Sequence, residues 1–171
     1  MEETHPFITY LTQTLVADRG ALAALRRGLG QPPGFAPEML RFVVPFLPER
    51  PSAWHERTLY MLASLFALHP AHTGEGNLGD HFARLKSEDN TALERRFTAL
   101  LAAHPDELDI HLRRAVAMFK SKDIPVNWDQ LLKDCLAWSH PERQARVRRR
   151  WAMRFWRVQP VATSESETEQ A

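Results

Sequence analysis

The apolar residues of this chain recur every three or four positions along nearly its whole length, and this spacing constrains the fold more than any other feature. Phe7, Leu11 and Leu15 follow it near the start. Residues 54–68 are the most hydrophobic stretch, with apolar side chains that wrap widely around a helix axis. An α-helix repeats every 3.6 residues, so this spacing is typical of helices packed on a core. Strand-like alternation is nearly absent, and the sequence therefore predicts an all-α fold of about nine helices.

Breaks in this pattern indicate how the chain is organised. Pro and Gly residues interrupt it at several points, most strongly in the segment 69–77, HPAHTGEGN, which we predict to be a flexible loop. We therefore expect two helical bundles, over residues 1–70 and 71–158. Residues 159–171 contain three glutamates and no basic residue, and we expect this tail to be disordered. The first helix is expected to end near Arg19 and Gly20, and Ser139 is a candidate cap for the last helix.

Composition is that of a globular protein, with 44% hydrophobic and 25% charged residues. The net charge of +1 hides a segregation, because the chain without its tail has 22 basic and 18 acidic residues. Cys135 is the only cysteine, which excludes an internal disulfide and a cysteine-rich metal site. The sequence shows neither the basic start and apolar run of a signal peptide nor an apolar segment long enough for a membrane span. We expect a cytoplasmic protein with no membrane contact.

The stretch 141–157, PERQARVRRRWAMRFWR, restricts function most. It holds seven arginines against one acid, Glu142. On a helix, Arg143, Arg146, Arg150, Arg154 and Arg157 fall within one arc of about 80°. The neighbouring positions Val147, Trp151 and Phe155 form an apolar stripe. Such a helix can pack on a core along one edge and present a row of guanidinium groups along the next. Guanidinium groups suit phosphate oxygens, although a row of charges on one helix is also common as a solvated face.

Paired arginines recur on other predicted helices. They are Arg26-Arg27, Arg95-Arg96 and Arg113-Arg114, beside the run 148–150. Adjacent helical residues differ by 100°, so one member of each pair can brace the margin of the core while the other faces outward. A fold that aligned these residues would form a basic surface that binds phosphates regardless of sequence and is sensitive to salt. Trp156 lies outside both the apolar stripe and the arginine arc, and could stack on a base, although packing is the favoured interpretation.

Catalytic constellations with usable spacing are absent from the sequence. His69 and His72 could ligate a metal, but no carboxylate stands at ligand spacing from them. His104 falls on an apolar stripe, and Cys135 on the apolar face of its helix, which indicates a buried structural thiol. The glycines at 28, 30 and 34 punctuate a turn and do not form a phosphate loop. We therefore predict no enzyme activity, no metal and no cofactor.

Three segments in order carry a resemblance to a known family: LRRGLGQPPGFAPEMLRFVVPFLP, LERRFTALLAAHPDELDIHLRRAVAMF and VNWDQLLKDCLAW, followed by the arginine-rich last helix. Together they resemble the CasB (Cse2) small subunit of the type I-E CRISPR Cascade complex, over about residues 7–157. The resemblance implies an all-helical, two-bundle, non-enzymatic protein that contacts crRNA-guided Cascade subunits and pairs head to tail with a second copy of itself. It also implies binding to target DNA without sequence preference, above all to the strand displaced in the R-loop.

The resemblance places a basic surface on the arginine pairs, and the last helix extends it. The expected nucleic-acid-binding residues are Arg26, Arg27, Arg95, Arg96, Arg113, Arg114, Arg143, Arg146, Arg149 and Arg150. Two alternatives stay open. The protein could be a purely architectural subunit whose arginines contact acidic protein partners, or a hydrolase whose metal-dependent turnover requires His69 and His72.

Overall fold

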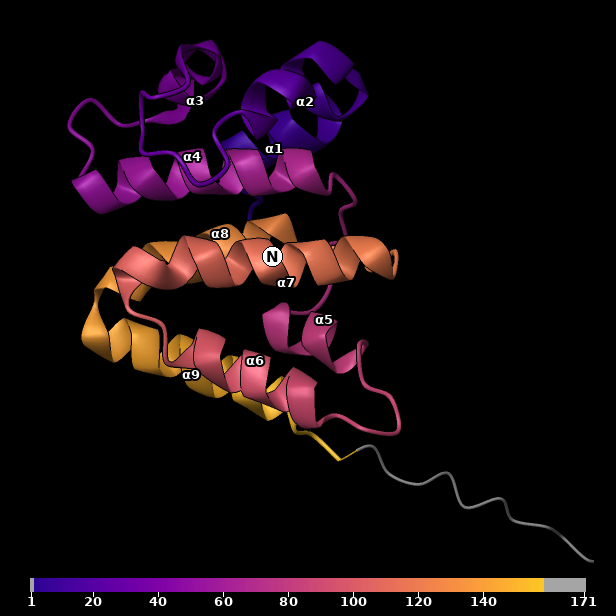
Figure 1. The fold of residues 1–171 in the computed structure, drawn as a ribbon. Coiled ribbons are helices and arrows are strands. Elements are labelled where there is room, and N and C mark those ends of the chain that lie inside the picture. The colour runs from indigo at the N-terminus through magenta and orange to yellow at the C-terminus, as the bar shows by residue number, and fades with distance from the viewer. Residues whose placement is uncertain (1, 159–171) are drawn as a thin grey trace, which may run out of the picture.

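The computed structural model describes residues 2–158, and these residues form an all-α fold as predicted. Figure 1 shows its nine α-helices, which are joined by five short 3-10 helices. The α-helices are α1 (Pro6–Gln13), α2 (Arg19–Arg26), α3 (Leu40–Val43), α4 (Ala53–Leu68), α5 (Leu78–Ala83), α6 (Thr91–Leu101), α7 (Leu108–Ser121), α8 (Trp128–Leu136) and α9 (Pro141–Phe155). The predicted tail, residues 159–171, lies outside the described part of the chain.

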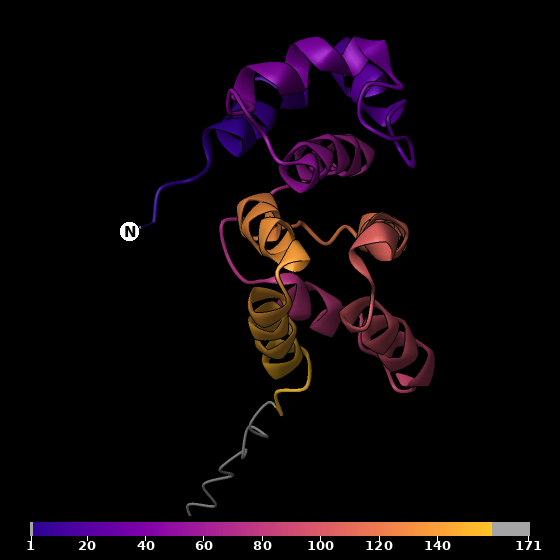
Figure 2. The same cartoon turned by 90° about the vertical axis from the view of Figure 1, so that its left-hand side faces the viewer.

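The helices are stacked in layers around α4. Figures 1 and 2 show α1, α2 and α3 on one side of α4, and α7 and α8 on the other. Helices α5, α6 and α9 form the layer beyond α7 and α8. Figure 2 shows α6 and α7 on one side of the molecule and α8 and α9 on the opposite side; in Figure 1 the first pair lies in front of the second. This arrangement decides which arginines can act together.

Helix α4 is the central buried helix that its composition predicts. Every residue from Thr58 to Ala67 is buried, because α2 packs on one side of α4 while α7 and α8 pack on the other. The buried side chains on both sides of α4 belong to one hydrophobic cluster. The division into bundles 1–70 and 71–158 stays a prediction.

The segment 69–77 forms more hydrogen bonds with the rest of the protein than its composition indicates. Its backbone pairs with that of Val126, through Thr73 N–H to the Val126 carbonyl at 3.1 Å and Val126 N–H to the Ala71 carbonyl at 3.1 Å. The indole N–H of Trp128 also donates to the Ala71 carbonyl, at 3.0 Å. The His69 ring nitrogen Nε2 lies 2.7 Å from the Ile124 carbonyl. The predicted flexible loop is therefore a hydrogen-bonded connection, a feature that depends on residues more than fifty positions away.

Two predicted helix ends were wrong. The residues Arg19 and Gly20 begin α2 instead of ending α1, because the Asp18 carboxylate caps the new helix by accepting from Ala21 N–H at 2.9 Å. Ser139 does not cap α9, because it belongs to the 3-10 helix Ala137–Ser139. His140 holds the extended backbone that a cap position requires, without a side-chain hydrogen bond to the helix.

A close contact between α5 and α9 depends on Gly79. A methyl group added at Gly79 would lie 2.0 Å from the Trp151 carbonyl oxygen, so only glycine allows the two backbones to approach in this way. The contact brings Phe82 of α5 against Phe97 and Phe155, with ring centroids 4.9 and 6.3 Å away. These aromatic rings form the part of the core that anchors α6 and α9.

We expect Gly79→Ala to lower the free energy of unfolding by about 1–3 kcal/mol, because the added methyl group forces α5 and α9 apart. Helix propensity alone would give the opposite sign, since alanine favours a helix over glycine by about 1 kcal/mol. Urea denaturation measures the change. Gly74→Ala is the control, because nothing lies within 4 Å of the added methyl group there. A Gly79→Ala variant as stable as Gly74→Ala would contradict the contact.

Buried His81 should make the fold sensitive to acid. Its Nε2 accepts the Asn127 N–H at 3.0 Å, and burial lowers the pKa of His81 from 6.5 to about 4. The neutral ring is favoured in the folded state, so its stabilisation is complete above pH 6.5 and is lost as pH falls towards 4. We expect the unfolding free energy to decrease over this range by up to about 3 kcal/mol on account of His81.

Denaturant titrations at a series of pH values check this expectation. His81→Gln should flatten the acid slope relative to the wild-type protein, whereas His140→Gln, at an exposed position, should leave it unchanged. Equal slopes in all three proteins would show that His81 does not carry the effect.

Candidate nucleic-acid interface

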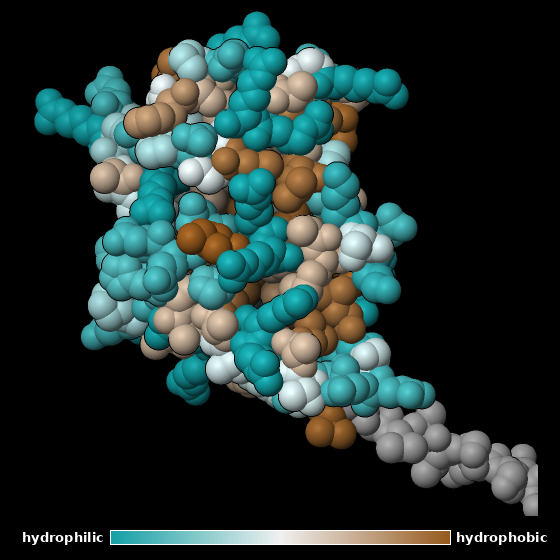
Figure 3. Space-filling model, in the orientation of Figure 1, coloured by the Kyte–Doolittle hydropathy of each residue, from teal (hydrophilic) through white to brown (hydrophobic). Residues whose placement is uncertain are grey.

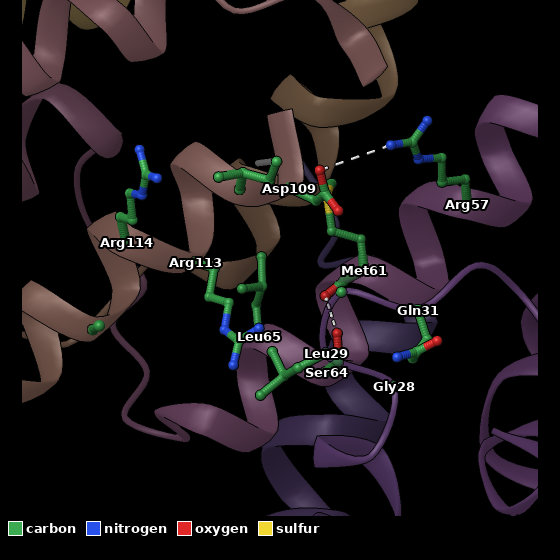
Figure 4. Close-up of a pocket in the computed structure, with 13 residues that line it drawn as sticks. Gly28, Leu29, Gln31, Arg57, Met61, Ser64, Leu65, Asp109, Arg113 and Arg114 are labelled. Carbon is green, nitrogen blue, oxygen red and sulfur yellow. Dashed lines mark hydrogen bonds and ion pairs between the residues drawn. The ribbon is translucent and has the colours of Figure 1, made fainter. Parts of the chain in front are cut away.

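Three exposed arginines lie on α6 and α7 and line two neighbouring hollows. Arg96 of α6 reaches across to α7, with its Nη1 3.2 Å from the Met118 sulfur. Arg96 and Arg114 line the same shallow hollow between the two helices. Arg113 and Arg114 also line a groove of about 400 Å³ between α7, α4 and the turn 28–31 (Figure 4). We call Arg96, Arg113 and Arg114 the α6–α7 arginine cluster.

The sequence of α7 explains why its arginines face outward. Its buried face consists of Leu108, Leu112, Ala115, Val116 and Phe119, at helical spacing. Arg113 and Arg114 fill the two positions between buried residues, so each is turned away from the core. Within the described residues, no member of the cluster forms an ion pair with a carboxylate. Their charges are available to an external anion.

The face that carries the cluster is mixed in character. Figure 3 shows the side of the molecule with α4, α6 and α7 toward the viewer, where hydrophilic side chains predominate and hydrophobic patches show between them. Ile110 of α7 is one of the exposed hydrophobic residues, with 50% of its surface accessible. A surface of this kind offers both charge and apolar contact to a partner.

The two arginines at the C-terminal end of α2, Arg26 and Arg27, are held by the protein itself. The Arg26 Nη1 donates to the Ala67 carbonyl at 3.2 Å, close to the C-terminal end of α4. The Arg27 Nη1 lies 3.1 Å from the Glu38 carboxylate, in an exposed ion pair. One arginine of the pair thus braces a neighbouring helix and the other faces outward, which is the division of roles that adjacent helical positions predict.

The predicted arc of α9 is divided by two acidic residues of other helices. Arg150 forms an ion pair with Asp134 of α8 at 3.0 Å, and Arg154 with Asp80 of α5 at 2.8 Å. Both arginines line a polar hollow with Gln130. The other members of the arc, Arg143, Arg146 and Arg157, are exposed and form no ion pair within residues 2–158. The same holds for the other expected binding residues Arg149 of α9 and Arg95 of α6.

Asp134 is the residue of this region that the sequence reasoning missed. It is 2% exposed, and its carboxylate accepts from the Trp151 indole N–H at 2.7 Å and from the Gln130 amide at 3.0 Å. Burial raises the pKa of Asp134, while the hydrogen bonds and the Arg150 charge oppose that rise. The sequence does indicate that Asp134 is buried, because Asp134 shares one helical stripe with the apolar residues Leu131, Cys135 and Trp138.

The expected basic surface therefore separates into groups. Arg96, Arg113 and Arg114 lie together on the α6–α7 side. Arg150 lies at the contact of α8 and α9, on the opposite side (Figure 2). Arg26 and Arg27 lie at the C-terminal end of α2, on the other side of α4 (Figure 1). The tertiary structure thus gives the α6–α7 cluster a separate position from the α9 arginines.

Trp156 follows α9 and is 42% exposed. Its ring meets Phe97 and Phe155 at centroid distances of 5.3 and 4.9 Å. Packing thus accounts for one side of the indole, in line with the favoured interpretation from the sequence.

The candidates for catalysis occupy structural positions. Cys135 is fully buried, and burial raises the pKa of its thiol well above the usual value. His104 is exposed, contrary to the apolar stripe on which it was placed, because its ring accepts the Asp106 N–H and so caps the next turn. Residues 2–158 contain no group of three metal-ligating side chains. None of the described helices is long and apolar enough to cross a membrane.

Comparison with known proteins gives consistent matches. A family model described as CRISPR-associated protein Cse2 matches residues 21–156. A CRISPR-associated protein Cse2 from Thermus thermophilus is 36% identical over 140 residues, which cover 80% of this chain and 78% of that protein.

Solved structures agree with these matches. The crystal structure of CasB from Thermus thermophilus has a TM-score of 0.78 and 31% identity, and the match covers 91% of this chain and 99% of that one. A chain in a structure described as a CRISPR RNA-guided surveillance complex has a TM-score of 0.73 and 27% identity. That match covers 87% of this chain and 88% of the other.

We expect Asp134→Ala to lower the free energy of unfolding by about 1–3 kcal/mol, because it leaves the buried Trp151 N–H without an acceptor. Thermal and urea denaturation measure the loss. Glu38→Ala removes the carboxylate of the exposed pair with Arg27 and should change stability by less than about 1 kcal/mol. Equal effects of the two substitutions would argue against a structural role for Asp134.

Proposed function

The chain belongs to the CRISPR-associated Cse2 family, whose members are subunits of the CRISPR RNA-guided surveillance complex Cascade, and on that premise we propose that it is a non-catalytic nucleic-acid-binding subunit. In this proposal, exposed arginines bind phosphates of the target DNA without reading its sequence. The subunit thereby stabilises the R-loop, especially the displaced strand. Crystal structures of CasB and a chain of a surveillance complex share its fold.

One observation carries the proposal: the α6–α7 arginine cluster is exposed and has no carboxylate partner within residues 2–158. By contrast, Arg27, Arg150 and Arg154 each pair with an acid of the same chain. Guanidinium groups that stay unneutralised on a folded surface are suited to phosphate oxygens, which they bind in bidentate fashion. In this proposal the α6–α7 arginine cluster is therefore the main phosphate-binding group.

A displaced single strand fits this surface better than a defined duplex sequence. It offers a phosphate at every nucleotide and no fixed pattern of groove contacts. In this proposal Arg95 of α6 adds to the cluster, and Arg143, Arg146 and Arg149 of α9 form a second, separate group of phosphate contacts, because all four are exposed without an ion pair in the described chain. A second copy of the chain would prolong the path along the strand.

A purely architectural role is the second candidate. The pairs Arg27–Glu38, Arg150–Asp134 and Arg154–Asp80 show that arginines of this chain pair readily with carboxylates. Acidic surfaces of neighbouring subunits could use the exposed arginines in the same way. This role predicts assembly into a larger complex without any affinity of the isolated protein for DNA.

We expect the double variant Arg96→Gln and Arg114→Gln to weaken binding of single-stranded DNA and to flatten its salt dependence. Each phosphate contact on a single strand contributes about 0.7 to the slope of log K against log salt, so two lost contacts lower the slope by roughly 1.4. Fluorescence anisotropy with labelled oligonucleotides, at several salt concentrations, gives the slope. Two oligonucleotides of unrelated sequence should behave alike.

The matched control is Arg19→Gln with Arg50→Gln, which removes the same charge from two exposed arginines outside the cluster. A smaller change of slope in this control supports the assigned surface. Identical slopes in both double variants would show that the effect comes from the net charge of the protein and not from the position of the arginines. If the wild-type protein binds no DNA yet co-purifies with a larger assembly, the architectural role replaces the proposal.

A further inference from the structure

We propose that the groove between α4, α7 and the turn 28–31 receives one base of a single strand, while Arg113 and Arg114 hold the adjoining phosphates. This inference rests on the proposed function and adds to it a site for the base. The groove has a volume of about 400 Å³, and the three segments that line it are far from one another in the sequence (Figure 4). Such a volume is in the range of pockets that hold small organic ligands.

Small residues create the groove. Gly28 packs against Met39, where an added methyl group would lie 2.1 Å from the sulfur, so the turn must run close to its neighbours without a side chain. Ser64 of α4 turns its hydroxyl to the Met61 carbonyl of its own helix, at 2.9 Å. Ala117 of α7 presents only a methyl group. Space therefore remains between α4 and α7 at the level of the turn.

The surfaces that face this space are apolar. Met61 and Leu65 of α4, Leu29 of the turn and Ile110 of α7 line it. Met61 and Leu65 are buried, whereas Ile110 is half exposed at the rim. A nucleobase presents two flat faces that gain from apolar contact, and a methionine sulfur adds favourable contact with an aromatic ring.

Positive and negative charges lie at different parts of the groove's rim. Figure 4 shows Arg113 reaching over the groove towards Leu65 and the turn, with Arg114 pointing away on the same helix. Asp109 lies at another part of the rim, where the Arg57 guanidinium is 3.8 Å from its carboxylate. Arg57 is also bound to Asp106, at 3.0 Å, so these acids neutralise it. A phosphate is thus attracted to Arg113 and Arg114 and repelled at Asp109.

This combination favours a nucleotide over an aromatic side chain of a protein partner. An apolar groove alone would accept either. The two arginines beside it have no ion pair within the described chain, and each phosphate of a strand can neutralise one of them. A base in the groove places its own phosphates at the rim, which is charge complementarity that an apolar peptide does not supply.

The test compares two single-stranded oligonucleotides of twelve residues, one of thymidines and one with the same backbone but no bases. We expect the wild-type protein to bind the thymidine strand at least about fivefold more tightly, since one base on a protein surface is worth about that factor or more. Ala117→Phe fills the groove and should abolish most of this preference, leaving affinity for the abasic strand unchanged.

Ala53→Phe is the matched control, because Ala53 is exposed at the start of α4 and does not line the groove. It should keep the preference of the wild-type protein. Equal binding of both strands by the wild-type protein, or equal weakening of both by Ala117→Phe, would overturn the inference while phosphate binding stood. If neither strand binds, the proposed function itself fails.

A second measurement needs no variant. A strand with 2-aminopurine in place of one base should brighten on binding, because a base that enters the groove leaves its stacked neighbours. No change in fluorescence on binding would count against the groove.

Unchanged DNA binding by Ala117→Phe with loss of co-purifying subunits would assign the groove to a protein side chain instead.

Discussion

The fold depends on the burial of α4 from both sides. A helix that is apolar over a wide arc must be covered almost all round, and α4 is buried without interruption from Thr58 to Ala67. The N-terminal helices cover one side, and α7 and α8 cover the other. Each layer then presents its own polar surface outward. The positions of α7 and of the turn 28–31, and so the groove between them, follow from how they cover α4.

Buried polar groups fix how the remaining helices meet. His81 accepts a backbone N–H from Asn127, and Asp134 joins α8 to Trp151 and Arg150 of α9. A buried polar atom without a partner is costly, so these contacts admit one arrangement of α5, α8 and α9 and penalise others. The same contacts neutralise part of α9. Structure and charge are thus coupled, because the residue that secures the helix also removes an arginine from the free surface.

The arginines illustrate two uses of one side chain. Where an acid or a carbonyl group is within reach, as for Arg26, Arg27 and Arg150, the guanidinium group holds two helices together. Where none of the described residues offers such a group, as in the α6–α7 arginine cluster, the charge stays available to an external anion. A count of basic residues does not separate these cases, since both kinds are exposed to some degree and both stand in arginine pairs.

The sequence by itself determined the all-α fold and the burial of α4, because apolar periodicity fixes which face of a helix meets the core. It also carried the family resemblance, through motifs of fixed order. It was wrong at Arg19–Gly20 and at Ser139, where a cap depends on a few backbone angles. Only the tertiary structure decided that Asp134 and Asp80 pair with the α9 arginines and that Arg96 and Arg114, from two helices, line one hollow. Such contacts join residues far apart in the chain, and no local pattern records which acid comes within reach of which arginine.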